Sequence, residues 1–172
     1  MNINIFFIAT SAFLLIILFV FKPLDIKQES LKDVPLFNMS TFTMQELNTQ
    51  GLITLMSGSE GVKYSNRYTV KDIDYTDNSK DYVANMTAIN GVYKNDIVTL
   101  VGDVVYFRED GLTFETKKAV YNKKTSISRA DGEYVLYRNS DRVIGKKLRY
   151  NNESEKIKSI NVTAKYQLKE GK

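Results

Sequence analysis

Apolar and polar residues alternate in short runs along most of the chain after residue 35. In residues 97–107, every second residue is apolar or glycine, namely Val98, Leu100, Gly102, Val104 and Tyr106. Alternate side chains of a strand point to the same face of the sheet, so residues of this parity share one face. Asp110–Gly111 then predicts a hairpin turn, after which Leu112 and Phe114 continue the buried face. The pattern therefore predicts a β-hairpin with one buried face.

A short repeat accompanies this alternation. Residues 71–78, 117–124 and 146–153 each contain two polar residues, a small or aliphatic one, a variable one, a tyrosine and a polar turn. Repeats of this kind indicate stacked supersecondary units that bury their apolar faces against one another. Chance coincidence in a chain rich in Tyr and Lys is the alternative.

Turn residues divide the remaining sequence into further β-like segments. Turns are predicted at residues 49–51, at Gly58 and Gly61, at Ser65–Asn66, at Asn90–Gly91 and at residues 94–96. No helix is predicted beyond residue 35. About eight to twelve short strands at regular spacing predict an all-β sandwich, roll or barrel.

The N-terminal stretch has a different pattern. Residues 3–21 carry no charge, and as a helix they span about 28 Å, close to the thickness of the hydrocarbon core of a bilayer. A cleaved signal peptide is the alternative, but the first four residues carry no charged side chain and residues 19–23 are a poor cleavage site. We therefore expect a transmembrane helix over 3–21, a linker over 22–35 and a β-domain over 36–172.

The flanking charges leave the orientation of this helix open. Three lysines follow it, which favours a cytoplasmic C-terminal part, but acidic residues alternate with them and long domains translocate largely regardless of charge. The lysines are Lys22, Lys27 and Lys32, and the acidic residues are Asp25, Glu29 and Asp33.

Composition excludes several kinds of catalysis. The chain has no His and no Cys, which rules out Ser-His-Asp and Cys-His catalysis and ordinary zinc sites. The densest carboxylates, Asp72, Asp74 and Asp77, are of the type that acts as an acid-base pair or binds Ca²⁺. A solvated outer face explains them better. The net charge of +4 does not require a nucleic-acid partner.

Lysine-rich clusters also have two interpretations. Lys117–Lys118, Lys123–Lys124 and residues 146–149 contain the side chains that grip phosphates. We favour a role in solubility and in protecting sheet edges from unwanted pairing.

Several of these motifs together resemble a known family. Residues 100–104, Gly111–Leu112, Thr116, Tyr121, Gly145 and residues 148–150 are similar to the repeat shared by the lipopolysaccharide transport proteins LptA, LptC and the periplasmic part of LptD. Residues 42–52, followed by Tyr64, resemble the first hairpin of these proteins. A single N-terminal helix ahead of one such domain resembles the LptC family.

This resemblance implies an all-β, open β-jelly-roll after a single N-terminal transmembrane helix, with an apolar interior exposed to lipid acyl chains. It implies a non-catalytic protein without cofactors, anchored in the inner membrane with its domain in the periplasm, that takes part in lipopolysaccharide export. The helix and N-terminal edge would meet LptF and LptG, whose ATPase is LptB, and the C-terminal edge would meet LptA. A membrane-anchored scaffold with a closed core is the alternative, and an anchored carbohydrate-active enzyme is a third candidate.

Parity, repeat equivalence and the resemblance assign residues to three sites. The expected lipid groove comprises Leu100, Val104, Tyr106, Leu112, Phe114, Tyr121, Ile127, Leu136, Leu148, Tyr150, Ile157, Val162 and Tyr166. The expected partner joints comprise Phe42 and Met44 near the N-terminal edge, with Ile160, Val162, Ala164, Tyr166 and Leu168 at the C-terminal edge. Small residues let membrane helices approach closely, so Thr10, Ser11 and Ala12 are the expected helix-packing face.

The membrane-helix expectation is testable directly. Replacing Thr10, Ser11 and Ala12 together by leucine should weaken co-purification with LptF and LptG, because the bulkier side chains keep the helix backbones apart. Co-purification from detergent extracts measures this. Unchanged recovery would mean that the helix only tethers the domain.

Overall fold

The computed structural model describes residues 13–14, 33–49 and 51–167 of the chain. The chain divides into two units, Met1–Leu31 and Lys32–Lys172. The expected transmembrane helix, including Thr10, Ser11 and Ala12, lies outside the described residues except for Phe13 and Leu14. Within the described ranges, no helix combines the length and apolar character needed to cross a membrane.

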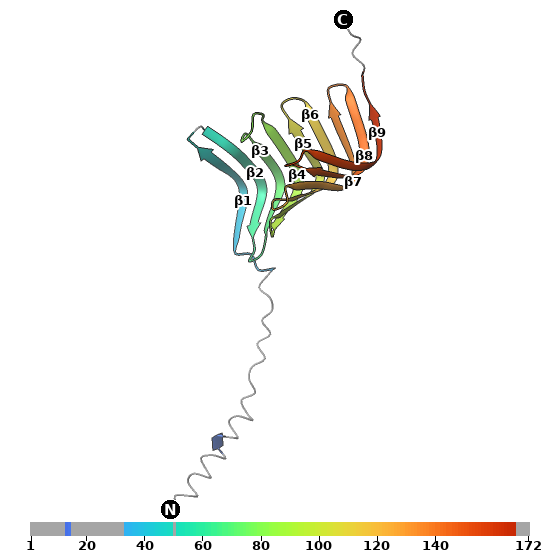
Figure 1. The fold of residues 1–172 in the computed structure, drawn as a ribbon. Helices are drawn as coiled ribbons and strands as arrows, with labels where there is room; N and C mark the ends of the chain where they lie inside the picture. Colours follow the sequence, from blue (N-terminus) through green and yellow to red (C-terminus); the bar gives the residue numbers. More distant parts are fainter. Residues whose placement is uncertain (1–12, 15–32, 50, 168–172) are drawn as a thin grey trace, which may run out of the picture. The chain divides into compact units, whose positions relative to one another are not determined.

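The second unit is built on one antiparallel sheet whose strands lie side by side in chain order (Figure 1). Its nine strands are β1 (Phe37–Asn48), β2 (Gly51–Lys63), β3 (Tyr68–Asp77), β4 (Ala84–Lys94), β5 (Ile97–Arg108), β6 (Leu112–Asn122), β7 (Ile127–Arg138), β8 (Asp141–Asn151) and β9 (Lys156–Lys165). The prediction of an all-β domain is confirmed. Within the described residues, β1 and β9 each have a neighbour on one side only.

Three predicted turns are wrong, because their glycines lie inside strands. Gly91 lies within β4, where a Cβ atom would be 2.3 Å from Cδ1 of Ile73. Gly58 and Gly61 lie within β2, against the ring of Phe42. These glycines make room for a neighbouring side chain rather than turning the chain. The predicted turn at residues 94–96 is confirmed, and Asn95 and Asp96 both have the left-handed φ of a two-residue hairpin turn.

The strands are bent near their middles, along a line that we call the seam. From β4 to β9, the register of each neighbouring pair shifts near the middle of its strands. Left-handed φ values mid-strand mark the same line, at Thr41, Asp72, Gly102, Asp103, Lys147 and Asn161. Bulges of this kind bend a strand and increase its twist, and Figure 1 shows the strands curving along their length.

The seam divides the sheet into two arms. The first arm ends at the β2–β3, β4–β5, β6–β7 and β8–β9 turns, and the second arm ends at the other four turns. The buried core lies at the seam and comprises Ile73, Ala88, Leu100 and Val104. Side chains from both arms pack against it, namely Val70, Val98 and Ala119 from the first and Tyr75 and Met86 from the second. The sheet therefore folds over the face that carries this core, which we call the inner face.

The predicted repeat has a structural counterpart in β6 and β8. Asn122 Oδ1 accepts hydrogen bonds from the backbone N–H groups of Lys124 and Thr125. Asn151 Oδ1 accepts the equivalent bonds from Glu153 and Ser154. Residues 117–124 and 146–153 therefore both run from the seam to the same kind of turn. Residues 71–78 run from the seam to the opposite end of the sheet, because β3 points the other way.

Gly145, at the seam, leaves room for the side chain of Tyr134. Tyr134, 4% exposed, lies directly opposite Gly145, and its hydroxyl donates to Ser159 Oγ at 3.0 Å. Ser159 Oγ donates in turn to the carbonyl of Lys146 at 2.9 Å. A Cβ atom on Gly145 would lie 2.6 Å from the Tyr134 hydroxyl and 2.8 Å from Cζ. The tyrosine thus crosses over Gly145 and joins β7 to β9.

We predict that Gly145→Ala lowers the free energy of unfolding by about 1–3 kcal/mol, the usual cost of overpacking. Gly132→Ala in β7 is the matched control, because a Cβ atom there meets nothing within 4 Å. Urea denaturation of the purified protein measures both. Equal stability of the two variants would show that Tyr134 moves aside freely.

Candidate functional site

A row of apolar side chains crosses all nine strands on the inner face of the second arm. Directly opposed residues of neighbouring strands project to the same side of a sheet. The consecutive partners in this row are Met44, Met56, Tyr75, Met86, Tyr106, Phe114, Leu136, Val143 and Ala164. All of them are partly or largely exposed, and Met44 at the first strand is 51% exposed. The chain thus leaves a continuous apolar surface open.

The base of this surface, at the seam, is closely packed. Val104 is 2% exposed, and the rings of Phe114 and Tyr134 stack with centroids 5.7 Å apart. Thr116 is buried, and its hydroxyl donates to the carbonyl of Glu133 at 2.8 Å. Among the described residues, every buried side-chain polar atom has a hydrogen-bond partner. Water therefore has little to bind at the base, which suits an apolar ligand.

The inner face of the first arm ends in aromatic side chains near its turns. Tyr68 and Tyr93 are direct partners, with ring centroids 6.2 Å apart. Lys63 and Lys123 lie over these two rings at 5.4 and 5.7 Å. The same row continues through Val98, Tyr121, Ser128, Tyr150 and Ile157. A tyrosine side chain has an apolar ring and a polar hydroxyl, so it suits this position between an apolar surface and water.

Charged side chains end the second arm. Asp110, in the β5–β6 turn, accepts from Arg108 at 2.5 Å and from Arg138 at 2.8 Å. The hydrogen bond from Arg108 is the main cause that lowers the pKa of Asp110. The Arg108 guanidinium also lies 4.4 Å from the centre of the Tyr82 ring. This cluster fixes the turn beside the apolar row.

Tyr106, within the apolar row, stays uncharged. Burial is the main cause that raises the pKa of Tyr106 to about 12, with the neighbouring Tyr82 as a further cause. The hydroxyl is therefore protonated throughout the physiological pH range. The row thus presents no ionised group of its own.

The outer face is mixed, with exposed apolar residues such as Phe107 and Ile144, but charged side chains line its seam. Along the seam it carries three ion pairs, Lys71–Glu60 at 2.5 Å, Lys146–Glu133 at 2.7 Å and Lys117–Asp103. These groups are largely solvated, so each pair contributes little to stability. The lysine-rich clusters of the sequence therefore lie mainly on the solvated side of the sheet.

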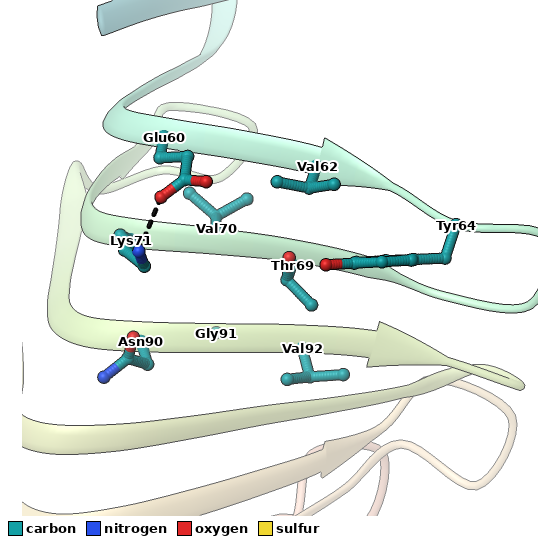
Figure 2. A pocket seen from close by; sticks show the side chains of 9 residues that line it. All are labelled: Glu60, Val62, Tyr64, Thr69, Val70, Lys71, Asn90, Gly91 and Val92. Carbon is teal, nitrogen blue, oxygen red and sulfur yellow. Dashed lines mark ion pairs between the residues drawn. The ribbon is translucent and has the colours of Figure 1, made fainter. Parts of the chain in front are cut away.

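A depression of about 230 Å³ lies beside the Lys71–Glu60 pair in the first arm (Figure 2). It is lined by Glu60, Val62, Tyr64, Thr69, Val70, Lys71, Asn90, Gly91 and Val92. Its one carboxylate is bound to Lys71, and this hydrogen bond is the main cause that raises the pKa of the lysine. The depression thus lacks an acid-base pair, and the apolar row is the stronger candidate site.

The carboxylates singled out in the sequence do not converge. Asp72 accepts from Ser59 at 2.6 Å and Asp74 accepts from Asn85 at 2.6 Å. Asp77 accepts from the backbone N–H of Ser79 at 2.9 Å. Three separate hydrogen-bonding roles explain them without shared chemistry.

The strand register places most of the expected groove residues on the inner face. These are Leu100, Val104, Tyr106, Leu112, Phe114, Tyr121, Leu136, Leu148, Tyr150, Ile157 and Val162. Ile127 lies on the outer face, because it is opposite Asn122 and Asn151 while its neighbour Ser128 lies in the tyrosine row. Tyr166 follows the end of β9 and is 65% exposed.

The expected joint residues lie on the edge strands, with one difference of face. Phe42 and Met44 are on the inner face of β1, and Val162 and Ala164 are on that of β9. Ile160 lies on the outer face opposite Lys146, because the bulge at Asn161 separates it from Val162. Leu168 lies outside the described residues.

The part of the row on β2, β3 and β4 was not identified from the sequence. Met56, Tyr75 and Met86 extend the apolar surface to Met44. A signal for one of them was present, since Tyr75 is the tyrosine of the repeat unit at residues 71–78. The two methionines lie in runs too mixed for parity to identify.

Comparisons with known proteins agree with this architecture. No curated protein matches the chain. The solved structure of LptH from Pseudomonas aeruginosa, described as the LptA-homologous periplasmic component of the lipopolysaccharide transport device, has a similar fold. The TM-score is 0.50 and the sequence identity 12%, over 81% of this chain and 99% of that one. The expectation of an LptA-like fold is thus confirmed.

The family comparison covers nearly the whole chain. The model of the family described as "Lipopolysaccharide-assembly, LptC-related" matches residues 5–167. This match includes all nine strands and therefore both edges and the whole apolar row. The chain belongs to the LptC family of lipopolysaccharide-assembly proteins.

Proposed function

We propose that this protein binds the acyl chains of lipopolysaccharide on its apolar inner face. It receives the lipid from an inner-membrane ATP-binding-cassette transporter and passes it to the periplasmic protein LptA, without catalysis of its own. The observation that carries the proposal is the row from Met44 to Ala164, which is apolar on every strand and open to a ligand.

The geometry of the row suits an elongated apolar ligand. Strands in a sheet are spaced by about 4.8 Å, so eight intervals give a path of roughly 38 Å across the sheet. Exposed apolar surface of this extent is a liability unless something covers it. Acyl chains cover it without needing hydrogen bonds, while a polar headgroup stays in water beyond the ends of the arms.

The two edge strands suit a chain of such domains. Both β1 and β9 have one side without a strand neighbour, and an added strand satisfies such backbone groups by β-augmentation. We propose that β1, with Phe42 and Met44, joins LptF, and that the N-terminal helix packs with LptF and LptG, which LptB drives. We propose that β9, with Val162 and Ala164, joins LptA, near Ile160, Tyr166 and Leu168. Each joint would extend the apolar row onto the partner.

Transport then needs no chemistry in this domain. An inner membrane anchor holds the domain on the periplasmic side, and ATP hydrolysis in LptB supplies direction. The domain contributes a surface on which the acyl chains stay out of water while they move. A scaffold protein with a closed core has no use for an apolar row that remains exposed.

We predict that Phe114→Asp reduces lipopolysaccharide crosslinking at least tenfold. A carboxylate placed on this face must lose water when acyl chains cover it, which disfavours binding. A photoreactive residue at Met56, in the same row, reports the contact in cells. Ile144→Asp is the matched control, because Ile144 is 40% exposed on the outer face of β8.

Retained crosslinking in a folded Phe114→Asp protein would refute the groove assignment. Circular dichroism of the purified variant establishes that it is folded. Equal losses in Phe114→Asp and Ile144→Asp would point to general destabilisation and would also count against the assignment.

We predict that truncation after Ser159 abolishes LptA binding and leaves co-purification with the transporter intact. The truncation removes more than half of β9 and with it the edge that pairs with LptA. Truncation after Lys169 is the matched control, because it leaves β9 and Leu168 in place. LptA binding that survives the shorter protein would place the joint elsewhere.

A further inference from the structure

The C-terminal edge of the sheet carries an unusual arrangement of like charges. Lys158 of β9 is directly opposite Arg149 of β8, and Lys165 is directly opposite Arg142. All four side chains belong to exposed residues. Directly opposed side chains of antiparallel strands lie about 4.5–5.5 Å apart at Cβ, and like charges at that distance destabilise the pair. Two such pairs therefore work against the β8–β9 pairing.

Both pairs lie on the outer face. Tyr150 and Ile157 are partners in the inner tyrosine row, so the adjacent pair Arg149 and Lys158 points outward. Val143 and Ala164 are partners in the inner apolar row, so Arg142 and Lys165 also point outward. The charges therefore stand away from the proposed lipid surface.

The charge extends inward from the edge in the first arm. Arg129 of β7 is directly opposite Arg149, so that three cations stand in line across β7, β8 and β9. Lys156 adds a further cation on the same face of β9, opposite Asn151. This line ends at the unpaired side of the edge strand.

Several nearby carboxylates have other partners, including Asp141 beside Arg142, which accepts from the backbone N–H of Gln167 at 3.0 Å. Glu133 pairs with Lys146, Glu115 accepts from the Tyr137 hydroxyl, and Glu153 accepts from Ser126. Asp131 lies on β7 beyond Arg129. None of the ion pairs among the described residues involves Arg142, Arg149, Lys158 or Lys165. The edge therefore keeps an uncompensated positive charge.

We infer that this edge selects a partner strand that carries carboxylates on its outer face, opposite Lys158 and Lys165. The inference rests on the β9 joint of the proposed function and names what the joint recognises. Pairing of an acidic strand turns each repulsion into a cross-strand attraction, and it fixes the register because a slip of one residue moves the carboxylates to the other face.

The same charges disfavour stacking of this chain on itself. In such a stack, β1 of a second copy would pair with β9. The outer face of β1 offers Asn38, Ser40, Thr43 and Gln45, none of which is acidic. An acidic partner strand therefore competes favourably with a second copy, which is the specificity that an open sheet edge needs.

The experiment uses the full-length protein and two eight-residue synthetic strands that carry glutamate or lysine at both end positions, with valine and threonine between them. This spacing matches Arg142 and Arg149, which face Lys165 and Lys158 from β8 and are seven positions apart. We expect the glutamate strand to bind about tenfold more tightly than the lysine strand, and to weaken as salt increases. The double variant Lys158→Glu and Lys165→Glu should reverse that preference. It should also unfold at a higher temperature, because each glutamate now faces an arginine.

The double variant Lys94→Glu and Lys118→Glu is the matched control. It makes the same change in net charge at exposed positions away from β9, so it should keep the wild-type preference. If Lys158 and Lys165 only deter strand pairing, the β9 double variant should bind both synthetic strands more tightly than the wild type does. That result would overturn the inference.

The outcomes distinguish a failure of the charge selection from a failure of the proposed β9–LptA joint. Equal binding of both strands, together with loss of LptA on truncation after Ser159, would overturn the charge selection and leave the joint standing. No binding of either strand, together with LptA binding after truncation, would overturn both. Self-association of the wild type through β9 would also contradict the inference.

Discussion

The structure depends on keeping one apolar face continuous through the bend of every strand. A single-layer sheet has no second layer to cover its face, so its core forms only where the two arms approach each other at the seam. Neighbouring strands cross the seam with different numbers of residues. In β5 the inner residues next to the seam are Leu100 and Val104, whereas in β6 they are Ala119 and Thr116. The extra residue of β5 is accommodated at Gly102 and Asp103, which have left-handed φ, and the bulge bends the sheet without turning its apolar side outward.

This solution limits the stability that burial can supply. Val104 and Leu100 are almost fully buried, and such side chains contribute about 1.5–3 kcal/mol each. The longer apolar row from Met44 to Ala164 remains partly exposed and contributes less. An open inner face and a strong core therefore compete for the same side chains. The seam, with the buried Leu100 and Val104, stabilises the fold and leaves the rest of the face exposed, as the proposed lipid binding requires.

The charges on the outer face and at the edge strands are related to the open form of the sheet. Because the sheet does not close, it has two strands with unpaired sides, and these would pair indiscriminately without a device against it. Ion pairs neutralise the seam, whereas β9 presents lysines opposite arginines. The repulsion weakens the last strand pair slightly, and the acidic partner strand inferred above would relieve it.

The sequence by itself determined the all-β class, the inner parity of β5 and β6, the hairpin at Asp110–Gly111 and the family resemblance. Alternation and turn chemistry are local, so they can be read from neighbouring residues. Only the tertiary structure decided the register, because a bulge changes which parity faces inward. That is why Ile160 lies on the outer face despite its apolar character, and why Met56 and Met86 join the row. Glycines show the same limit, since Gly91 fits a turn by composition but serves the close approach of Ile73, a residue eighteen positions away.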